Sequence, residues 1–178
     1  MPTDRFYVTT PIYYVNDRPH IGHAYTTVIA DALARFHRLR GAAVRFVTGT
    51  DENSQKNLDA MEKAGERDLA AYLDRMSGVW EATWHGLGIS FDDFIRTTEE
   101  RHLRGVERFW NAVMKSGDLE KRAYEGLYCV GCESFKTETD LNEDKRCPLH
   151  PNKDLQTVRE ENWFFKLTKY VPALRAHI

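Results

Sequence analysis

The chain has 178 residues, of which 42% are hydrophobic and 29% are charged, and its formal net charge is −2. This length can bury a real core and suits one domain with a small insert, while the near-neutral charge excludes a protein-wide basic field for nucleic acid but not a local basic patch. No segment approaches the roughly 20 apolar residues that cross a bilayer, and no signal peptide precedes the first strand. We therefore expect a soluble, cytoplasmic protein that has no membrane partner.

The first two thirds of the chain alternate predicted strands and helices. Residues 6–10 are aromatic and β-branched, which favours a strand, and apolar residues spaced by three and four then predict a helix from His20 to Gly41. Further predicted elements are a strand over 44–48, helices over 58–65 and 68–87, a weaker strand over 91–96 and a helix up to Gly117. Thr97 and Glu100 form the pattern of a capping box for that last helix. The alternation predicts an α/β fold with a parallel sheet.

The turn between the first strand and the first helix ends in His20-Ile21-Gly22-His23. Backbone N–H groups at a helix start are unpaired, and histidine supplies hydrogen-bond donors at neutral pH, so this turn suits the phosphates of a nucleoside triphosphate. Gly22 has no side chain, so a purine ring could approach the backbone closely. The simpler alternative is that His20 caps the helix and His23 is a surface residue. The strand-turn-helix context favours the phosphate site.

Asp51 follows the second predicted strand directly. Ligands of open parallel sheets bind at the carboxyl ends of the strands, and a carboxylate there can pair with the ammonium group of an amino acid. The alternative is that Asp51 caps the next helix, and both roles can coexist.

All three cysteines lie in a short, polar, turn-rich segment after Gly117. Cys129 and Cys132 form one pair of ligands and Cys147 and His150 a second, each with two residues between the ligands, and fourteen residues separate the pairs. This spacing is typical of a tetrahedral Zn²⁺ site that has no open position, so we expect a structural zinc whose binding supports folding. The alternative is free surface cysteines. Beyond the pairs, residues 163–167 predict a strand that leads into a helix.

His20-Ile21-Gly22-His23 after a first strand resembles the signature of the class I aminoacyl-tRNA synthetases. Three blocks in the same order, residues 7–16, 19–25 and 46–52, are similar to the methionyl-tRNA synthetases within that family. The resemblance covers essentially the whole chain. One departure is Asn53-Ser54, which stands where many family members have His-Gly.

The resemblance implies a Rossmann-like parallel sheet over residues 1–117, the first half of the class I catalytic domain. Residues 118–178 would begin an insertion that carries a zinc knuckle. It also implies that the chain is the N-terminal part of a longer enzyme and has little or no aminoacylation activity by itself.

The activity that the resemblance implies is that of a methionine–tRNA ligase in protein biosynthesis. ATP, with Mg²⁺ on its phosphates, and L-methionine would give methionyl-adenylate, and the methionyl group would then pass to tRNA(Met). His20 and His23 would be catalytic and would bind ATP together with Gly22. Asp51 would bind the methionine ammonium group. Ile12 and Tyr14 would line the pocket for the thioether, unless they are ordinary core residues.

The sequence leaves other functions open. Another class I synthetase, for a branched aliphatic amino acid or cysteine, would carry the same histidine tetrad. A zinc-ribbon module that binds nucleic acid without catalysis is a second alternative, and a small-molecule adenylyltransferase is a third.

Overall fold

The computed structural model describes residues 4–178, and the chain divides into two compact units between Glu107 and Arg108. Helix α4 (Glu100–Lys115) runs through this division. The boundary expected from the sequence, at Gly117, was set by the predicted end of that helix. The two compact units are instead defined by which parts of the chain pack together. The domains 1–117 and 118–178 therefore stay a prediction.

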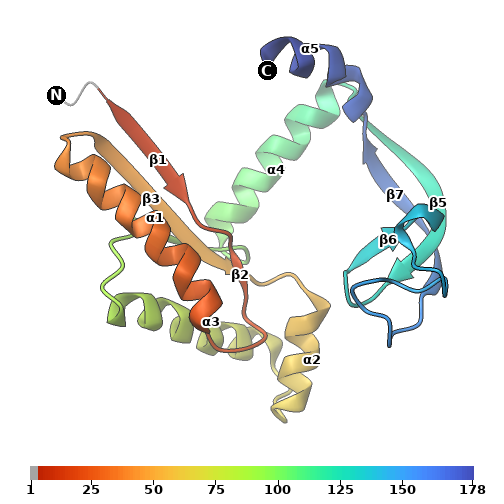
Figure 1. Cartoon of the computed structure of the whole chain (residues 1–178), viewed down its shortest axis with the longest axis horizontal. Coiled ribbons are helices and arrows are strands. Elements are labelled where there is room, and N and C mark those ends of the chain that lie inside the picture. Colours follow the sequence, from red (N-terminus) through yellow and green to blue (C-terminus); the bar gives the residue numbers. More distant parts are fainter. Residues whose placement is uncertain (1–3) are drawn as a thin grey trace. The chain divides into compact units, whose positions relative to one another are not determined.

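A four-stranded parallel sheet forms the centre of the first unit (Figure 1). Its longest strand, β3, pairs with each of the other three. The strands are β1 (Arg5–Thr9), β2 (Tyr13–Tyr14), β3 (Ala43–Asp51) and β4 (Asp93–Arg96). Thr50 pairs with Tyr13 on one side and Arg96 on the other, and Val47 likewise lies between β1 and β4. Because all pairings are parallel, the strands end at one common edge, which confirms the predicted α/β architecture.

Two helices, α1 (Ile21–Leu39) and α3 (Leu69–Gly86), pack on one face of this sheet. The short helix α2 (Gln55–Lys63) lies between β3 and α3 in the chain. Side chains along β1 alternate between exposed and half-buried, as a sheet covered on one face requires. On the covered face, Phe6 stacks on His37 of α1, and Thr50 shares a 2.6 Å hydrogen bond with Ser77 of α3.

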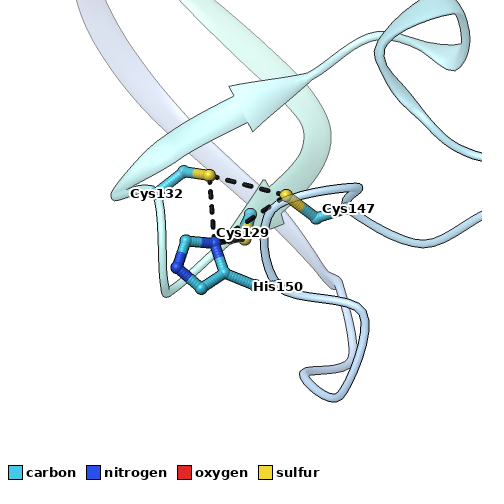
Figure 2. Close-up of side chains that lie close together, drawn as sticks. All are labelled: Cys129, Cys132, Cys147 and His150. Carbon is cyan, nitrogen blue, oxygen red and sulfur yellow. Dashed lines mark hydrogen bonds between the residues drawn. The ribbon is translucent and has the colours of Figure 1, made fainter.

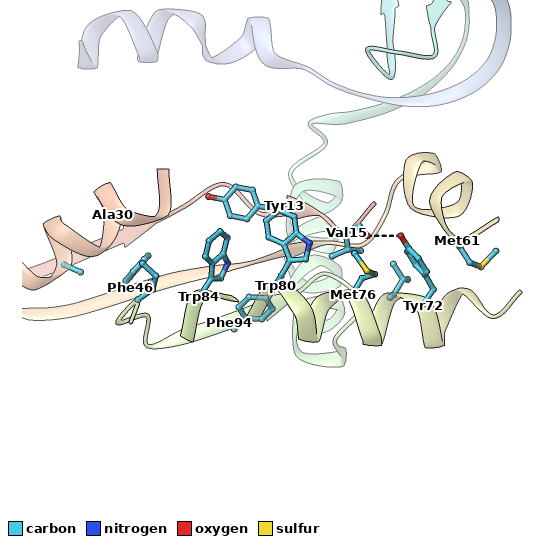
Figure 3. Packing of buried hydrophobic residues seen from close by; sticks show 13 residues of the cluster. Tyr13, Val15, Ala30, Phe46, Met61, Tyr72, Met76, Trp80, Trp84 and Phe94 are labelled. Carbon is cyan, nitrogen blue, oxygen red and sulfur yellow. Dashed lines mark hydrogen bonds between the residues drawn. The ribbon is translucent and has the colours of Figure 1, made fainter. Parts of the chain in front are cut away.

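Aromatic side chains dominate the core of the first unit (Figure 3). Trp80 and Trp84 rise from α3 toward Tyr13, whose ring stacks on that of Trp80 with centroids 5.0 Å apart. The Tyr72 hydroxyl donates to the carbonyl of Val15 at 3.2 Å. Buried aromatic area of this extent stabilises the fold by several kcal/mol, of order 1.5–3 per large side chain. The core therefore ties α3 to the segment that leads into α1.

The second unit contains a three-stranded antiparallel sheet in the order β6-β5-β7. Its strands are β5 (Leu119–Cys129), β6 (Ser134–Lys136) and β7 (Gln156–Phe165). Two 3₁₀ turns, η1 (Glu138–Asp140) and η2 (Leu167–Tyr170), and helix α5 (Val171–His177) complete it. Between 108 and 178 only Asp118, Cys129 and Cys147 are buried. This unit therefore has almost no apolar core.

The predicted capping box at Thr97 is wrong. Helix α4 begins at Glu100, so Thr97 lies three positions before its first residue and too far away to cap it. The Thr97 hydroxyl instead accepts the N–H of Glu52 at 2.8 Å. None of the helices in residues 4–178 combines the length and the apolarity needed to cross a lipid bilayer.

Candidate active site and metal centre

The two histidines of the His20–His23 turn lie against each other at the start of α1. Their rings are stacked with centroids 3.7 Å apart. His20 is the N-cap residue: its Nδ1 accepts the N–H of Gly22 at 3.1 Å. The Nδ1 of His23 in turn accepts the N–H of His20 at 3.3 Å. The expected alternative for His20, a helix cap, is thus confirmed, and it coexists with an exposed ring.

These hydrogen bonds determine where each ring carries its proton. A ring nitrogen that accepts a hydrogen bond carries no hydrogen, so these contacts favour the tautomer with its hydrogen on Nε2 for both imidazoles. Partial burial lowers the pKa of His23, and the neighbouring His20 lowers it further. In this tautomer the Nε2–H of each histidine is left to donate to a ligand.

The His23 ring is held by aromatic side chains of the core. Its centroid lies 5.1 Å from that of Tyr13 and 4.8 Å from that of Trp80, with both contacts edge to face. The Trp80 Nε1–H donates to the carbonyl of Asp17, in the turn that precedes the two histidines, at 2.9 Å. Trp80 therefore fixes both the turn and the ring.

The structure supplies a reason for glycine at position 22. A Cβ there would lie 2.9 Å from Cε1 and 3.1 Å from Nδ1 of His20. A side chain would push the imidazole away from the amide that it caps. The expected approach of a purine ring to this backbone stays a prediction.

Asp51 ends β3 at the same edge of the sheet, and its partner in the register is Tyr14. Its carboxylate accepts the N–H of Asn53 at 3.0 Å. Helix α2 takes Ser54 as its N-cap, so the alternative that Asp51 caps this helix is wrong. Tyr14 is paired with Asp51, and its neighbour Tyr13 contacts His23, so the structure brings these predicted residues to one edge.

Ile12 and Tyr14 are 41% and 36% exposed. The alternative that they are ordinary core residues is therefore wrong. The ammonium group of Lys56 lies over the Tyr14 ring, at 5.2 Å from the ring centroid. An exposed apolar side chain and an aromatic ring next to a carboxylate leave this edge open to a small ligand with apolar and charged parts.

A buried carboxylate next to Asp51 was missed by sequence reasoning. The Glu52 side chain has no exposed surface and pairs with Arg96 at the end of β4, at 2.7 Å. Burial opposes ionisation of Glu52, but hydrogen bonds from Arg96, Thr98 and Ser77 outweigh it and lower the pKa of the carboxyl group. The signal was present: an acid and an arginine stand at the ends of neighbouring parallel strands.

The second unit brings Cys129, Cys132, Cys147 and His150 together (Figure 2). The four ligand atoms lie within 4.8 Å of one another. From Nδ1 of His150 the sulfur atoms of Cys129, Cys132 and Cys147 are 3.8, 3.3 and 3.9 Å away. Four ligands at tetrahedral Zn–S and Zn–N bond lengths would be separated by about 3.5–3.8 Å. Three thiol groups and one imidazole in this arrangement fit a metal ion.

The local backbone is adapted to this cluster. A Cβ at Gly131 would lie 2.5 Å from two ring carbons of His150, so the glycine lets the imidazole approach. Burial opposes ionisation of Cys147, but hydrogen bonds from His150 and Cys132 lower the pKa of its thiol to about 6. Burial and the neighbouring thiols raise the pKa of Cys132. Thiols this close cannot all ionise easily without a cation among them.

Comparison with known proteins places this architecture in a family. Residues 6–162 match the family described as tRNA synthetases class I (M). The chain belongs to this family. The family assignment agrees with the resemblance seen in the sequence, and the strand-turn-helix with two histidines lies inside the matched range.

Individual relatives agree with the family match. The chain is 49% identical to the methionine–tRNA ligase of Synechocystis sp. over 93% of its length, and 46% identical to that of Fusobacterium nucleatum over 97%. It spans only 31% and 27% of those two proteins. Its structure superposes on Mycobacterium tuberculosis methionyl-tRNA synthetase in complex with methionyl-adenylate, with a TM-score of 0.87 and 38% identity, over 98% of this chain and 35% of the other.

Proposed function

We propose that the protein activates L-methionine with ATP and transfers it to tRNA(Met). The observation that carries the proposal is the match over nearly the whole chain to methionine–tRNA ligases, including a structure with methionyl-adenylate. In the first step an oxygen of the methionine carboxylate attacks the α-phosphorus of ATP, the bond to the β-phosphate breaks, and pyrophosphate leaves. A hydroxyl of the terminal ribose of the tRNA then attacks the carbonyl carbon of the adenylate, the bond from that carbon to the phosphate oxygen breaks, and AMP leaves.

In this proposal His20 and His23 stabilise the negative charge that develops on the phosphates. Since each Nδ1 accepts a backbone hydrogen bond, the Nε2–H of each ring can donate to a phosphate at the positive end of α1. The stacking of the rings and the contacts of His23 with Tyr13 and Trp80 support this role, because donors fixed in advance need no reorganisation during the reaction. Mg²⁺ would accompany the ATP phosphates as part of the substrate.

Asp51 would bind the methionine ammonium group. Its place at the carboxyl end of β3 and its half-buried carboxylate support this role. Ile12 and Tyr14 would line the side-chain pocket, since both are exposed at the same edge. Asn53 donates its N–H to Asp51, so the residue that departs from the family's usual histidine still helps to hold the carboxylate.

The metal centre would hold a structural Zn²⁺ through Cys129, Cys132, Cys147 and His150. Four protein ligands leave no position for a substrate, so the metal would stabilise the fold of the second unit and supply no step of the reaction. The Nδ1 of His150 would be the nitrogen ligand, because it is the ring atom that faces the three sulfur atoms (Figure 2).

The test is amino-acid-dependent exchange of pyrophosphate into ATP, measured on the full-length protein with methionine, isoleucine, leucine, valine and cysteine. Methionine should stimulate exchange far more than the others. Stimulation by a different amino acid would assign another class I synthetase, and no stimulation by any would overturn the proposal. Asp51→Asn should raise the KM for methionine by about tenfold or more, since a charge-assisted contact is lost. Asp59→Asn, on the exposed face of α2, is the control.

A further inference from the structure

Glu52 is a buried acid that the proposed mechanism does not use. Its carboxylate accepts two hydrogen bonds from Arg96, at 2.7 Å from Nε and 3.2 Å from Nη2. The hydroxyl groups of Thr98 and Thr50 donate to it as well. This carboxylate is thus saturated with donors and is closed to any ligand.

Arg96 connects three elements through this pair. It lies at the end of β4, binds Glu52 at the end of β3, and reaches Asp74 of α3 at 2.6 Å. A buried ion pair gains little net stability, because removing both charges from water offsets their attraction. Its well-supported use is to enforce one arrangement of the surrounding chain. In this protein the pair would arrange the segment next to Glu52.

That segment is the turn that carries Asp51. The backbone N–H of Glu52 donates to Thr97 at 2.8 Å, so both its backbone and its side chain are attached to the end of β4. Asn57, which is fully buried, donates to the carbonyl of Asp51 at 3.3 Å and holds the other side of the turn. These hydrogen bonds hold the backbone from which the Asp51 carboxylate projects.

We propose that Glu52 is a positioning residue that, through Arg96, fixes the direction of the Asp51 carboxylate. The proposal rests on the proposed function, in which Asp51 binds the ammonium group of methionine. Glu52 itself never touches the substrate. Loss of its charge leaves Arg96 with Asp74 as its remaining carboxylate partner, and the end of β3 is then held to the end of β4 by backbone contacts alone.

The test compares Glu52→Gln with Asp93→Asn in the full-length protein. Asp93 lies at the other end of β4 and accepts from Arg101 and Arg45, both at 2.8 Å, so its replacement breaks a similar ion pair away from the turn. Pyrophosphate exchange should give Glu52→Gln a KM for methionine raised by about tenfold, with the KM for ATP within about twofold of the parent value. Asp93→Asn should change neither KM. The double variant Glu52→Gln/Arg96→Gln should show a KM for methionine raised to about the same extent as in Glu52→Gln, because the pair that fixes the turn is absent from both.

A second readout does not depend on activity. Hydrogen exchange of the amides of residues 51–54 should accelerate in Glu52→Gln and stay unchanged in Asp93→Asn. Equal effects of both variants on KM and on exchange would show a general structural role and overturn the proposal, as would unchanged exchange at 51–54 in Glu52→Gln. If the parent protein activates no amino acid, the proposed function fails, whereas the amide exchange still decides whether Glu52 holds the turn.

Discussion

The two compact units hold their candidate sites in different ways. In the first unit, the histidine turn and Asp51 are supported by a parallel sheet, two covering helices and a cluster of buried aromatic residues. In the second, Cys129 ends β5 and the other three residues of the candidate metal centre lie in loops next to the antiparallel sheet. Between 108 and 178 only two of these cysteines and Asp118 are buried. The first site is supported by a hydrophobic core, whereas the candidate metal site lies in a unit that has almost no apolar core.

The two units therefore differ in what would hold their polar side chains in place. The first unit can position its polar groups before any ligand binds, because packing fixes the elements that carry them. If the proposed Zn²⁺ binds, the second unit would obtain most of its folding free energy from the ion. Perturbations of the core and of the metal should therefore act on different parts of the chain.

Removal of the metal should have the largest effect. Chelation should unfold the region from 119 to 165, because structural Zn²⁺ contributes about 10–16 kcal/mol in small zinc domains. Hydrogen exchange should show protection lost there and retained in β1, β3 and α3. Cys147→Ser should reproduce the loss together with a lower zinc content, and Leu149→Ala, an exposed neighbour, should not. Protection that persists after chelation would show that the second unit has a sufficient core of its own.

Substitution of a core tryptophan should have the next largest effect, confined to the first unit. Trp84 is fully buried, so Trp84→Ala should lower the free energy of unfolding by about 3–5 kcal/mol in urea titrations. Trp110 in the second unit is 40% exposed, and Trp110→Ala should cost less than half as much. Similar losses from the two variants would contradict the contrast between the units.

Alanine substitution of a glycine next to His150 tests the candidate metal centre. Gly131→Ala should weaken zinc binding by about 10–100-fold, the range seen when the support of a metal ligand is disturbed, because the new methyl group meets the His150 ring. Competition with a chromogenic chelator measures this. Gly78→Ala, in α3 with nothing within 4 Å of the new Cβ, is the matched control. It should leave zinc binding unchanged and stabilise the helix slightly, by about 0.5–1 kcal/mol.

Titration of His23 should have the smallest effect. Burial and His20 lower the pKa of His23 below the ordinary value of about 6.5. The unfolded chain therefore takes up this proton first as the pH falls, so the stabilising contribution of neutral His23 is present above that value and is lost as the pH falls through the folded pKa. NMR of the imidazole should show the lowered pKa. His20→Asn keeps a capping side chain and should raise the pKa of His23 by removing the neighbouring ring.

The sequence predicted those features that depend on local pattern. The strands β1, β3 and β4, helix α1 and the two ligand pairs follow from residue periodicity, the His20–Gly41 boundaries and the two-residue spacing of the ligands. The short strands β2 and β6 were not predicted. The Glu52–Arg96 pair and the true start of α4 were not predicted, because both depend on which residues meet at the ends of neighbouring strands. The same holds for β7, which begins at Gln156 because β5 offers a pairing partner, whereas its own sequence favours a strand only from Trp163.

The most direct test of the account is methionine-dependent pyrophosphate exchange by the full-length protein carrying His20→Ala and His23→Ala. Loss of two donors fixed at the start of α1 should reduce exchange by at least about 10²–10³-fold, with the helix content of the variant unchanged. Exchange near the parent rate in the folded double variant would show that the histidine turn does not stabilise the phosphates and would contradict the account.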